Sequence, residues 1–330
     1  MKHLWPMLVL PLFGWAPAQE PCPPGAPRVV IYHPGSVSPA FKAVEELFTR
    51  QTGVCVVDVA GGSVGLARQV TAGREPCDLL ASADSEIIER MVKPAGFADY
   101  TIRFAAGAMV LAYATGSRQA GTIAAPGKEA LAAPDWYAQL ARPGVTVAGS
   151  HPFLDPSGYR AHMIFQLVQD HYGAPGYYNE MLGHYRIAGA AGGLGQAFDY
   201  QFIYEHSARA AMKADATGTY RYVRLPDEVN LGAPGLEPIY GRRGVALPGL
   251  QSPGAAETVT LPATRVTWGI TLMNGAVNRE PALAFLQLLF SPQGAAILEA
   301  TGPAPISPPV VSRQDFARLP TVLKALVRPL

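Results

Sequence analysis

Two short segments of the sequence combine an apolar strand, a Gly-Ser turn and the start of a helix. Residues 31–37 contain the turn Gly35-Ser36, and residues 59–64 contain the turn Gly62-Ser63 in the same arrangement. The first turn of a helix has unpaired N–H groups and a partial positive charge, serine adds a hydroxyl donor, and glycine lets a ligand approach the backbone. Two such turns therefore predict a site that binds one small oxyanion through neutral donors.

The segments around these turns alternate between strands and helices. Apolar and β-branched runs predict the strands, and apolar residues at helical spacing predict the helices. Strands are expected at residues 28–33, 54–60, 78–81, 105–114, 145–149, 200–204, 220–225 and 266–273, and the longer helices at residues 39–50, 64–72, 84–92, 157–172, 282–290 and 292–300. This order predicts the α/β class, with mostly parallel sheets flanked by helices.

Two of the predicted strands divide the chain into two lobes. If residues 105–114 and 266–273 cross between lobes, the first lobe contains residues 19–110 and 266–330, and residues 111–265 form an inserted second lobe. Ligands bind open α/β sheets at the carboxyl ends of the strands. A ligand cleft between the lobes would therefore collect the Gly-Ser turns together with strand ends of the second lobe.

The N-terminus has the pattern of a secretory signal peptide. Lys2 and His3 precede an apolar stretch at residues 4–15, and small residues follow, so cleavage is expected after about Ala18. The apolar stretch is too short to span a bilayer. Residues 1–18 are therefore predicted to be a signal peptide, and the mature chain is expected to be periplasmic.

The composition excludes an electrostatic surface for nucleic acid or for an anionic membrane. The formal net charge is +1, and charged residues make up 15% of the chain. Hydrophobic residues make up 49%, which is typical of a folded core rather than of a disordered chain. We expect no nucleic acid partner and no membrane partner of this kind.

Three cysteines in an oxidising compartment allow one disulfide and leave one thiol. Cys22 precedes the first predicted strand, Cys55 lies at the start of the second, and Cys77 precedes the third. The first strand of a doubly wound sheet commonly lies between the second and third. Cys22 is therefore expected to be one partner, and either Cys55 or Cys77 the other.

An ordered series of motifs resembles the family of molybdate/tungstate-binding periplasmic proteins of ABC importers, and in particular its tungstate-type branch. The series spans nearly the whole mature chain. It consists of Gly35-Ser36-Val37, Ala60-Gly61-Gly62-Ser63-Val64, residues 78–84, 151–160, 199–204 and 225–231, and Trp268-Gly269-Ile270-Thr271-Leu272 followed by Asn278-Arg279-Glu280. The resemblance implies a two-lobed type II substrate-binding protein that closes on one oxyanion and delivers it to a membrane permease. It also implies no cofactor and a monomer.

The resemblance carries ligand roles over to particular positions. Hydroxyl and backbone donors come from both lobes, and the residues implied are Ser36, Ser63, Asp155, Ser157, Ile187 and Tyr204. No free metal cation is implied, although the carboxylate of Asp155 matches a position that bonds the metal centre of the oxyanion in one branch of the family. A second carboxylate is usual there, several residues before the Asp199-Tyr200 pair. Residues 190–198 contain no Glu, so tetrahedral as well as octahedral coordination stays open.

Asp155 constrains which anion fits. A lone carboxylate repels a free dianion in a dry site. Asp155 is therefore compatible with the site if it bonds a metal centre, is protonated, takes a proton from a protonated ligand, or points away. Tungstate or molybdate satisfies the first condition, hydrogen phosphate satisfies the third, and sulfate satisfies neither.

Each of these residues also has an ordinary structural interpretation. Ser36 and Ser63 are good helix N-caps, and Asp155 is a good cap for the helix that begins near Ser157. Tyr204 ends a strand, where packed aromatic residues are common. Arg160 is expected to form a structural pair rather than to contact the anion.

Three classes of function follow from these patterns. An oxyanion receptor, for tungstate or molybdate, comes first, a receptor for sulfate, phosphate or a small organic acid is second, and an exported enzyme of unknown chemistry is a distant third. The sequence contains no Gly-Lys-Ser or His-Glu-x-x-His motif. We therefore expect a binding protein without catalytic residues.

Overall fold

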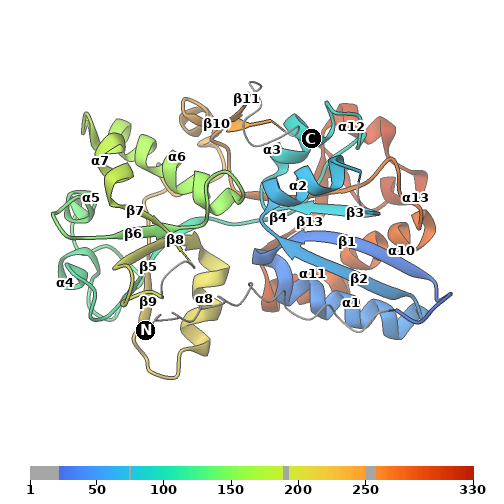
Figure 1. Ribbon diagram of the computed structural model, residues 1–330, viewed down its shortest axis with the longest axis horizontal. Helices are drawn as coiled ribbons and strands as arrows, with labels where there is room; N and C mark the ends of the chain where they lie inside the picture. Colours follow the sequence, from blue (N-terminus) through green and yellow to red (C-terminus); the bar gives the residue numbers. More distant parts are fainter. Residues whose placement is uncertain (1–21, 74–75, 189–192, 250–257) are drawn as a thin grey trace, which may run out of the picture.

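The first lobe is built on a seven-stranded sheet, seen on the right of Figure 1. The computed structural model describes residues 22–73, 76–188, 193–249 and 258–330, so the predicted signal peptide lies outside the described residues. The strand order is β14-β13-β4-β12-β3-β1-β2. The strands are β1 (Arg28–Pro34), β2 (Cys55–Gly61), β3 (Leu79–Ser82), β4 (Ile102–Ala106), β12 (Thr267–Leu272), β13 (Ala304–Val311) and β14 (Arg328–Pro329).

The second lobe is built on a five-stranded sheet with the order β7-β6-β8-β5-β9. Its strands are β5 (Met109–Ala114), β6 (Val147–Gly149), β7 (Tyr185–Ile187), β8 (Tyr200–Tyr204) and β9 (Tyr220–Arg224). A separate antiparallel hairpin pairs β10 (Gly244–Pro248) with β11 (Thr258–Pro262). The α/β class and the two-lobed organisation predicted from the sequence are confirmed.

Helices cover the sheets in both lobes (Figure 1). In the first lobe they are α1 (Ser38–Thr52), α2 (Ser63–Thr71), α3 (Ser85–Ile87), α10 (Arg279–Leu289), α11 (Pro292–Thr301), α12 (Arg313–Arg318) and α13 (Thr321–Lys324), with a 3-10 turn η1 (Gly35–Val37) before α1 and a π-helix η2 (Ile88–Val92) after α3. In the second lobe they are α4 (Ala120–Ile123), α5 (Trp136–Leu140), α6 (Pro156–His171), α7 (Tyr177–His184), α8 (Glu205–Ala214) and α9 (Glu237–Tyr240).

Helix α1 illustrates why the sequence forms these elements where it does. Phe41, Val44 and Phe48 recur at helical spacing and are buried against the sheet. Gly53 ends the helix with φ 72°, a left-handed conformation that glycine adopts without steric cost. The predicted strand, helix and terminating glycine are all found within two residues of their expected bounds.

The sheets are mixed, so the expectation of mostly parallel sheets is wrong. Parallel and antiparallel strand pairs are equally numerous in each of the two sheets. The parallel pairs lie where strand, helix and strand follow one another, as in β1 and β2. Two antiparallel pairs of the first sheet arise because the chain leaves the first lobe after β4 and returns through β12, which then lies between β3 and β4.

The single strand predicted at residues 105–114 is two strands. β4 ends at Ala106 in the first sheet, and β5 begins at Met109 in the second. Between them the Gly107 amide donates to the carbonyl of Val266 at 3.1 Å, so the two crossing segments lie side by side. Met109 and Val110 therefore already pair in the second sheet, and we propose a lobe boundary at residues 107–108 rather than after residue 110.

The disulfide joins Cys22 to Cys55, with the two α-carbons 5.8 Å apart. β1 lies between β2 and β3 as predicted, so a cysteine near either neighbouring strand could have paired with Cys22. The partner is Cys55, the first residue of β2. Cys77 is a free thiol, and burial raises its pKa, which keeps it neutral.

Among the described residues, no single helix has both the length and the apolar character needed to cross a membrane. The pair α10 and α11 passes that test only when taken together, and it is bent by 68° at the break.

Candidate functional site

The two serines of the Gly-Ser turns lie where strands β1 and β2 end. Ser36 lies within the turn η1, and Ser63 is the first residue of α2, so neither is a helix N-cap. The hydroxyl of Ser36 accepts a hydrogen bond from Trp268 Nε1 at 3.0 Å, and the hydroxyl of Ser63 accepts one from the Ala83 amide at 2.9 Å. A hydroxyl that accepts one bond still carries an O–H group that it can donate. Both serines are thus oriented as potential donors by other elements.

The N-terminus of α2 contacts the second lobe directly. The amides of Val64 and Gly65 donate to the carbonyl oxygen of Leu154 at 3.0 and 3.2 Å. The expectation that this helix end leaves its amides for an anion is therefore wrong for these two groups. They hold the segment just before Asp155, which brings Asp155 beside the Gly62-Ser63 turn: a β-carbon added at Gly62 would lie 3.3 Å from that of Asp155.

A third residue of α2, Arg68, also holds the lobes together. The guanidinium of Arg68 donates to the carbonyl oxygens of Phe153 at 3.0 Å, Pro248 at 2.7 Å and Gly249 at 3.3 Å. No sequence signal marks Arg68, because its partners are backbone groups that have no side-chain signature.

Asp155 is the N-cap of α6. Its Oδ1 accepts hydrogen bonds from the amide of Ser157 at 2.9 Å and from the hydroxyl of Ser157 at 2.8 Å. Both bonds end on the same oxygen, so capping engages one of the two carboxylate oxygens. Burial raises the pKa of Asp155, which favours its neutral form. The cap interpretation is confirmed, and it is compatible with a ligand contact through the other oxygen.

Tyr204 belongs to a buried polar cluster between the lobes. Its hydroxyl accepts a hydrogen bond from Arg160 Nη1 at 2.9 Å, and the same Arg160 atom donates to the carbonyl oxygen of Ala83 at 2.6 Å. Arg160 Nη2 lies 3.3 Å from the carboxylate of Asp84, which also accepts a bond from the Tyr159 hydroxyl at 2.6 Å. Arg160, Tyr159 and Tyr204 come from the second lobe, and Ala83 and Asp84 from the first. The predicted structural pair of Arg160 is confirmed, and it joins the lobes.

Trp268 and His206 connect Ser36 to this cluster. The ring of Trp268 lies 4.8 Å from that of Tyr204, and His206 Nε2 donates to the carbonyl oxygen of Ser36 at 2.8 Å. Burial lowers the pKa of His206 to about 4, so the imidazole is neutral near pH 7. Trp268 belongs to the motif at residues 268–272, whereas no sequence signal marks His206 as part of a site.

Ile187 is the exception among the six predicted positions. It ends β7, is 46% exposed, and lies opposite Gly149 in the strand register. The hydrogen bonds and ring contacts that connect the other five residues do not include Ile187. Residues 190–198, where the family resemblance implies a second carboxylate, lie partly outside the described residues.

The sequence matches the family described as "Bacterial extracellular solute-binding protein" over residues 29–303. The chain belongs to this family. A solute-binding protein of Petrotoga mobilis, described as uncharacterized, is 30% identical over 86% of this chain and 85% of its own length. The molybdate/tungstate-binding protein WtpA of Pyrococcus abyssi is 29% identical over 91% and 90%.

Solved structures agree with the two-lobed fold of this solute-binding protein. The sulfate-binding protein SubI of Mycobacterium tuberculosis H37Rv matches with a TM-score of 0.58 over 92% of both chains, at 16% sequence identity. That likeness concerns the fold alone. Solute-binding proteins are not enzymes, and this member binds rather than converts its solute. Its family is extracellular, which indicates a location outside the cytoplasm.

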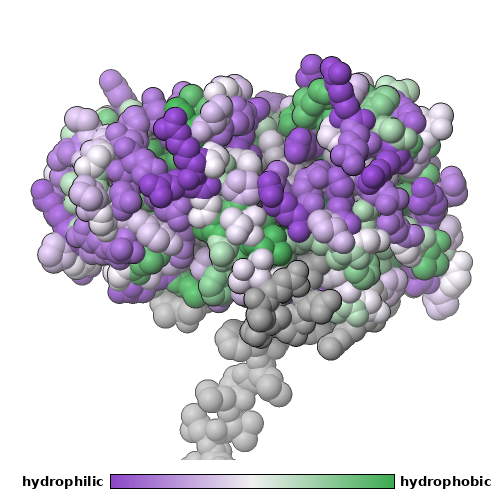
Figure 2. All heavy atoms as spheres, turned by 90° about the horizontal axis from the view of Figure 1, so that it is seen from above, coloured by the Kyte–Doolittle hydropathy of each residue, from purple (hydrophilic) through white to green (hydrophobic). Residues whose placement is uncertain are grey.

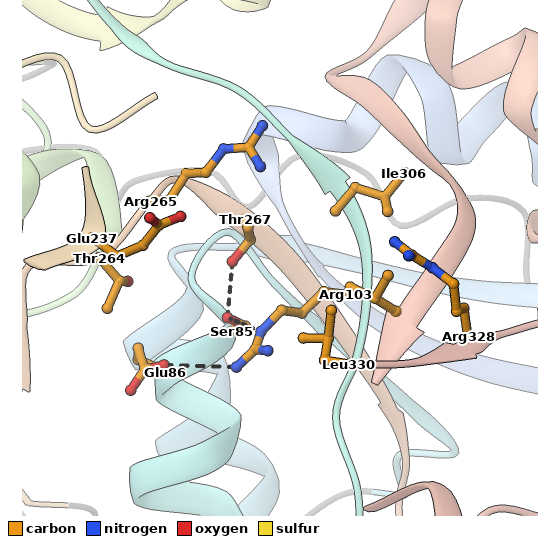
Figure 3. A pocket seen from close by; sticks show the side chains of 11 residues that line it. Ser85, Glu86, Arg103, Glu237, Thr264, Arg265, Thr267, Ile306, Arg328 and Leu330 are labelled. Atoms are coloured by element: carbon orange, nitrogen blue, oxygen red, sulfur yellow. Dashed lines mark hydrogen bonds and ion pairs between the residues drawn. The ribbon is translucent and has the colours of Figure 1, made fainter. Parts of the chain in front are cut away.

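The solute-binding protein also has a cavity of about 420 Å³ that residues of both lobes line, beside the returning strand β12 (Figure 3). Its charged lining side chains are Arg103, Arg265, Arg328, Glu86 and Glu237. Arg103 and Glu86 approach within 4.0 Å, which offsets part of the positive charge. None of the six predicted ligand residues lines this cavity, although Glu237 and Arg265 in its lining belong to the second lobe.

Proposed function

We propose that this protein binds one tetrahedral oxyanion, tungstate or molybdate, between its two lobes. The contact between the α2 turn and the start of α6 carries the proposal, since it brings Ser63 beside Asp155. The relative named as a molybdate/tungstate-binding protein covers nearly the whole chain, which supports the same ligand class. The fold match to a sulfate-binding protein does not select among oxyanions.

The chemistry of the contact suits a dianion held mainly by neutral donors. The hydroxyls of Ser36 and Ser63 each accept a bond from another element and are thereby oriented. Arg160 supplies a buried positive charge, most of which Asp84 balances at 3.3 Å. We infer that Ser36, Ser63 and Tyr204 act through hydroxyl groups, with the backbone near Ile187 as a further donor, and that Ser157 holds Asp155 in place by donating its hydroxyl to Oδ1.

Asp155 is the residue that would distinguish metal oxyanions from sulfate. A neutral Asp155 can donate a hydrogen bond to an oxyanion, and an ionised Asp155 can bond a tungsten or molybdenum centre. Sulfate offers no such centre. With one carboxylate rather than two, the bound ion stays tetrahedral if Asp155 donates a hydrogen bond, and becomes five-coordinate if Asp155 bonds the metal centre.

We also infer delivery of the ion to the permease of an ABC importer, from the periplasm and by a monomer. The exposed large apolar side chains among the described residues are few, and Figure 2 shows a largely hydrophilic face over both halves of the molecule. A stable dimer would need a larger apolar surface.

Calorimetric titration with tungstate, molybdate, sulfate and phosphate tests the proposal. We expect tungstate and molybdate to bind with a Kd of about 1 µM or lower, and to raise the free energy of unfolding by about 2.7 kcal/mol at 100 times Kd. Sulfate and phosphate serve as matched anions of the same shape. The proposal fails if neither metal oxyanion releases or absorbs heat, and a preference for sulfate or phosphate would support the second class of receptor.

Replacing Asp155 by asparagine should change anion selectivity. Asparagine caps a helix about as well as aspartate, so α6 keeps its cap while the carboxylate is lost. We expect the preference for tungstate over sulfate to fall on the order of tenfold, equivalent to about 1.4 kcal/mol. Asp155→Ala removes the cap as well and should lower Tm in addition. If the selectivity stays constant in both variants, Asp155 is a cap only.

A further inference from the structure

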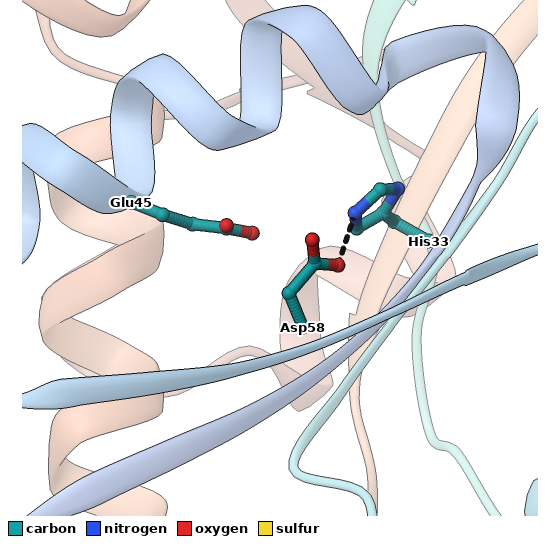
Figure 4. A group of neighbouring side chains, drawn as sticks. All are labelled: His33, Glu45 and Asp58. Carbon is teal, nitrogen blue, oxygen red and sulfur yellow. Dashed lines mark ion pairs between the residues drawn. The ribbon is translucent and has the colours of Figure 1, made fainter. Parts of the chain in front are cut away.

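Three side chains with metal-binding atoms converge under helix α1, away from the contact between the lobes (Figure 4). His33 comes from β1, Asp58 from β2 and Glu45 from α1. In the parallel register Ile31 lies opposite Asp58, so His33 and Asp58 point to the same face of the sheet, the one that α1 covers. One ligand atom from each of the three residues lies within 4.8 Å of the other two.

The cluster is buried, and one of its two carboxylates has no hydrogen-bond partner among the described residues. His33 is 0% and Glu45 3% exposed. Among the described residues, neither carboxylate oxygen of Glu45 has a hydrogen-bond partner, and Figure 4 shows this carboxylate directed at the other two side chains. A buried carboxylate without a partner is costly, and here two carboxylates share one imidazole. A cation at this position would remove the cost.

The imidazole is oriented as a ligand. His33 Nδ1 lies 3.1 Å from the carbonyl oxygen of Pro34, to which it donates. Nε2 then points to the Asp58 carboxylate, at 2.5 Å from Oδ1. A histidine that ligates a metal commonly donates its other N–H to a carbonyl or carboxylate in this way, which fixes the tautomer and the direction of the ring.

We propose that His33, Glu45 and Asp58 form a binding site for a divalent transition-metal cation such as Zn²⁺. One imidazole nitrogen and two carboxylate oxygens are suitable Zn²⁺ ligands, and the charge of the cation cancels that of the two carboxylates. Ligand bonds of about 2.0–2.2 Å require Nε2 and Oδ1 to move apart by less than about 1 Å. The side chain of Asp58 is 21% exposed and gives the ion a way in.

The test is zinc binding by the full chain without oxyanion, after treatment with a chelator and using zinc chloride. We expect one zinc ion per chain to remain after dialysis, and Tm to rise by at least about 3 °C at saturating zinc. Glu45→Gln keeps the shape of the side chain but removes a proposed zinc ligand. Loss of a residue that only hydrogen-bonds a metal ligand weakens metal binding roughly 10- to 100-fold, so we expect a larger loss of zinc affinity here.

Glu46→Gln is the matched control. Glu46 is the next residue of the same helix, its side chain is 58% exposed, and it lies 4.0 Å from Arg50, so its removal should leave zinc affinity unchanged. Equal zinc affinity in the two variants overturns the proposal. So does a wild-type Tm that responds to pH but not to zinc, manganese, cobalt or nickel chloride, because the cluster then holds only a proton.

Discussion

Replacing Arg160 by methionine is expected to weaken oxyanion binding roughly 150- to 4,000-fold, since loss of one partner from a buried ion pair costs about 3–5 kcal/mol. The guanidinium of Arg160 reaches across from the second lobe to the carboxylate of Asp84 and the carbonyl oxygen of Ala83. Asp84 is 1% exposed when the lobes are in contact. Methionine fills a similar volume but leaves that carboxylate buried without its cation.

The size of this effect depends on when Asp84 becomes buried. If the lobes separate in the absence of ligand, the Asp84 carboxylate is hydrated in the open form. The free energy of burying it without Arg160 then opposes closure of the lobes around the ligand. Calorimetry should then show a large loss of affinity, and thermal unfolding without ligand should show little change in Tm. Equal losses of stability with and without ligand would instead show that the lobes stay in contact.

Two further variants make the Arg160 result specific. The double variant Arg160→Met with Asp84→Asn removes both charges, and it should recover much of the lost affinity because no unpaired charge is buried. Arg243→Met breaks an exposed ion pair with Asp170 in the same lobe, and such pairs contribute about 0–1 kcal/mol. If Arg243→Met weakens binding as much as Arg160→Met does, the buried pair has no special role.

Replacing Gly62 by alanine is expected to weaken oxyanion binding roughly 5- to 100-fold, because overpacking a tight contact costs about 1–3 kcal/mol. A β-carbon at Gly62 would lie 2.5 Å from the carbonyl oxygen of Leu154 and 3.0 Å from its carbonyl carbon. These are backbone atoms of the other lobe, so they cannot rotate away. The amides of Val64 and Gly65 would lose their contact with the same carbonyl oxygen.

Gly65→Ala provides the matched control for Gly62→Ala. Gly65 lies within the same helix, and a β-carbon there would meet nothing within 4 Å. Alanine should stabilise α2 by about 0.5–1 kcal/mol and leave the affinity unchanged. Titration of both variants with tungstate measures the difference. Equal affinities would mean that the close approach at Gly62 is not part of the bound form.

Some features followed from the sequence because they depend on neighbouring residues. A run of β-branched residues predicts β1, and the helical spacing of Phe41 and Phe48 predicts α1. Gly53 ends that helix because glycine tolerates a positive φ. The cap formed by Asp155 is equally local, since its partner is two residues away. For the same reason the ordered motifs were sufficient to predict a two-lobed binding protein.

Other features depended on residues far apart in the sequence. The position of β12 between β3 and β4 made the sheets mixed, and the crossing at Gly107 divided a run that reads as one strand. Strand direction and pairing arise from how the chain returns to a sheet, and local propensity does not encode that path.

The sequence by itself determined which residues have the chemistry to hold an oxyanion, and it placed Ser36 and Ser63 at strand ends through short-range turn signals. Only the tertiary structure decided which partners they and their neighbours have. The Leu154 carbonyl at the start of α2, Arg160 against Asp84, and Glu45 beside His33 all join segments that are distant in the chain. Burial and charge balance at these points are properties of packed elements, so they appear only when the lobes and layers are assembled.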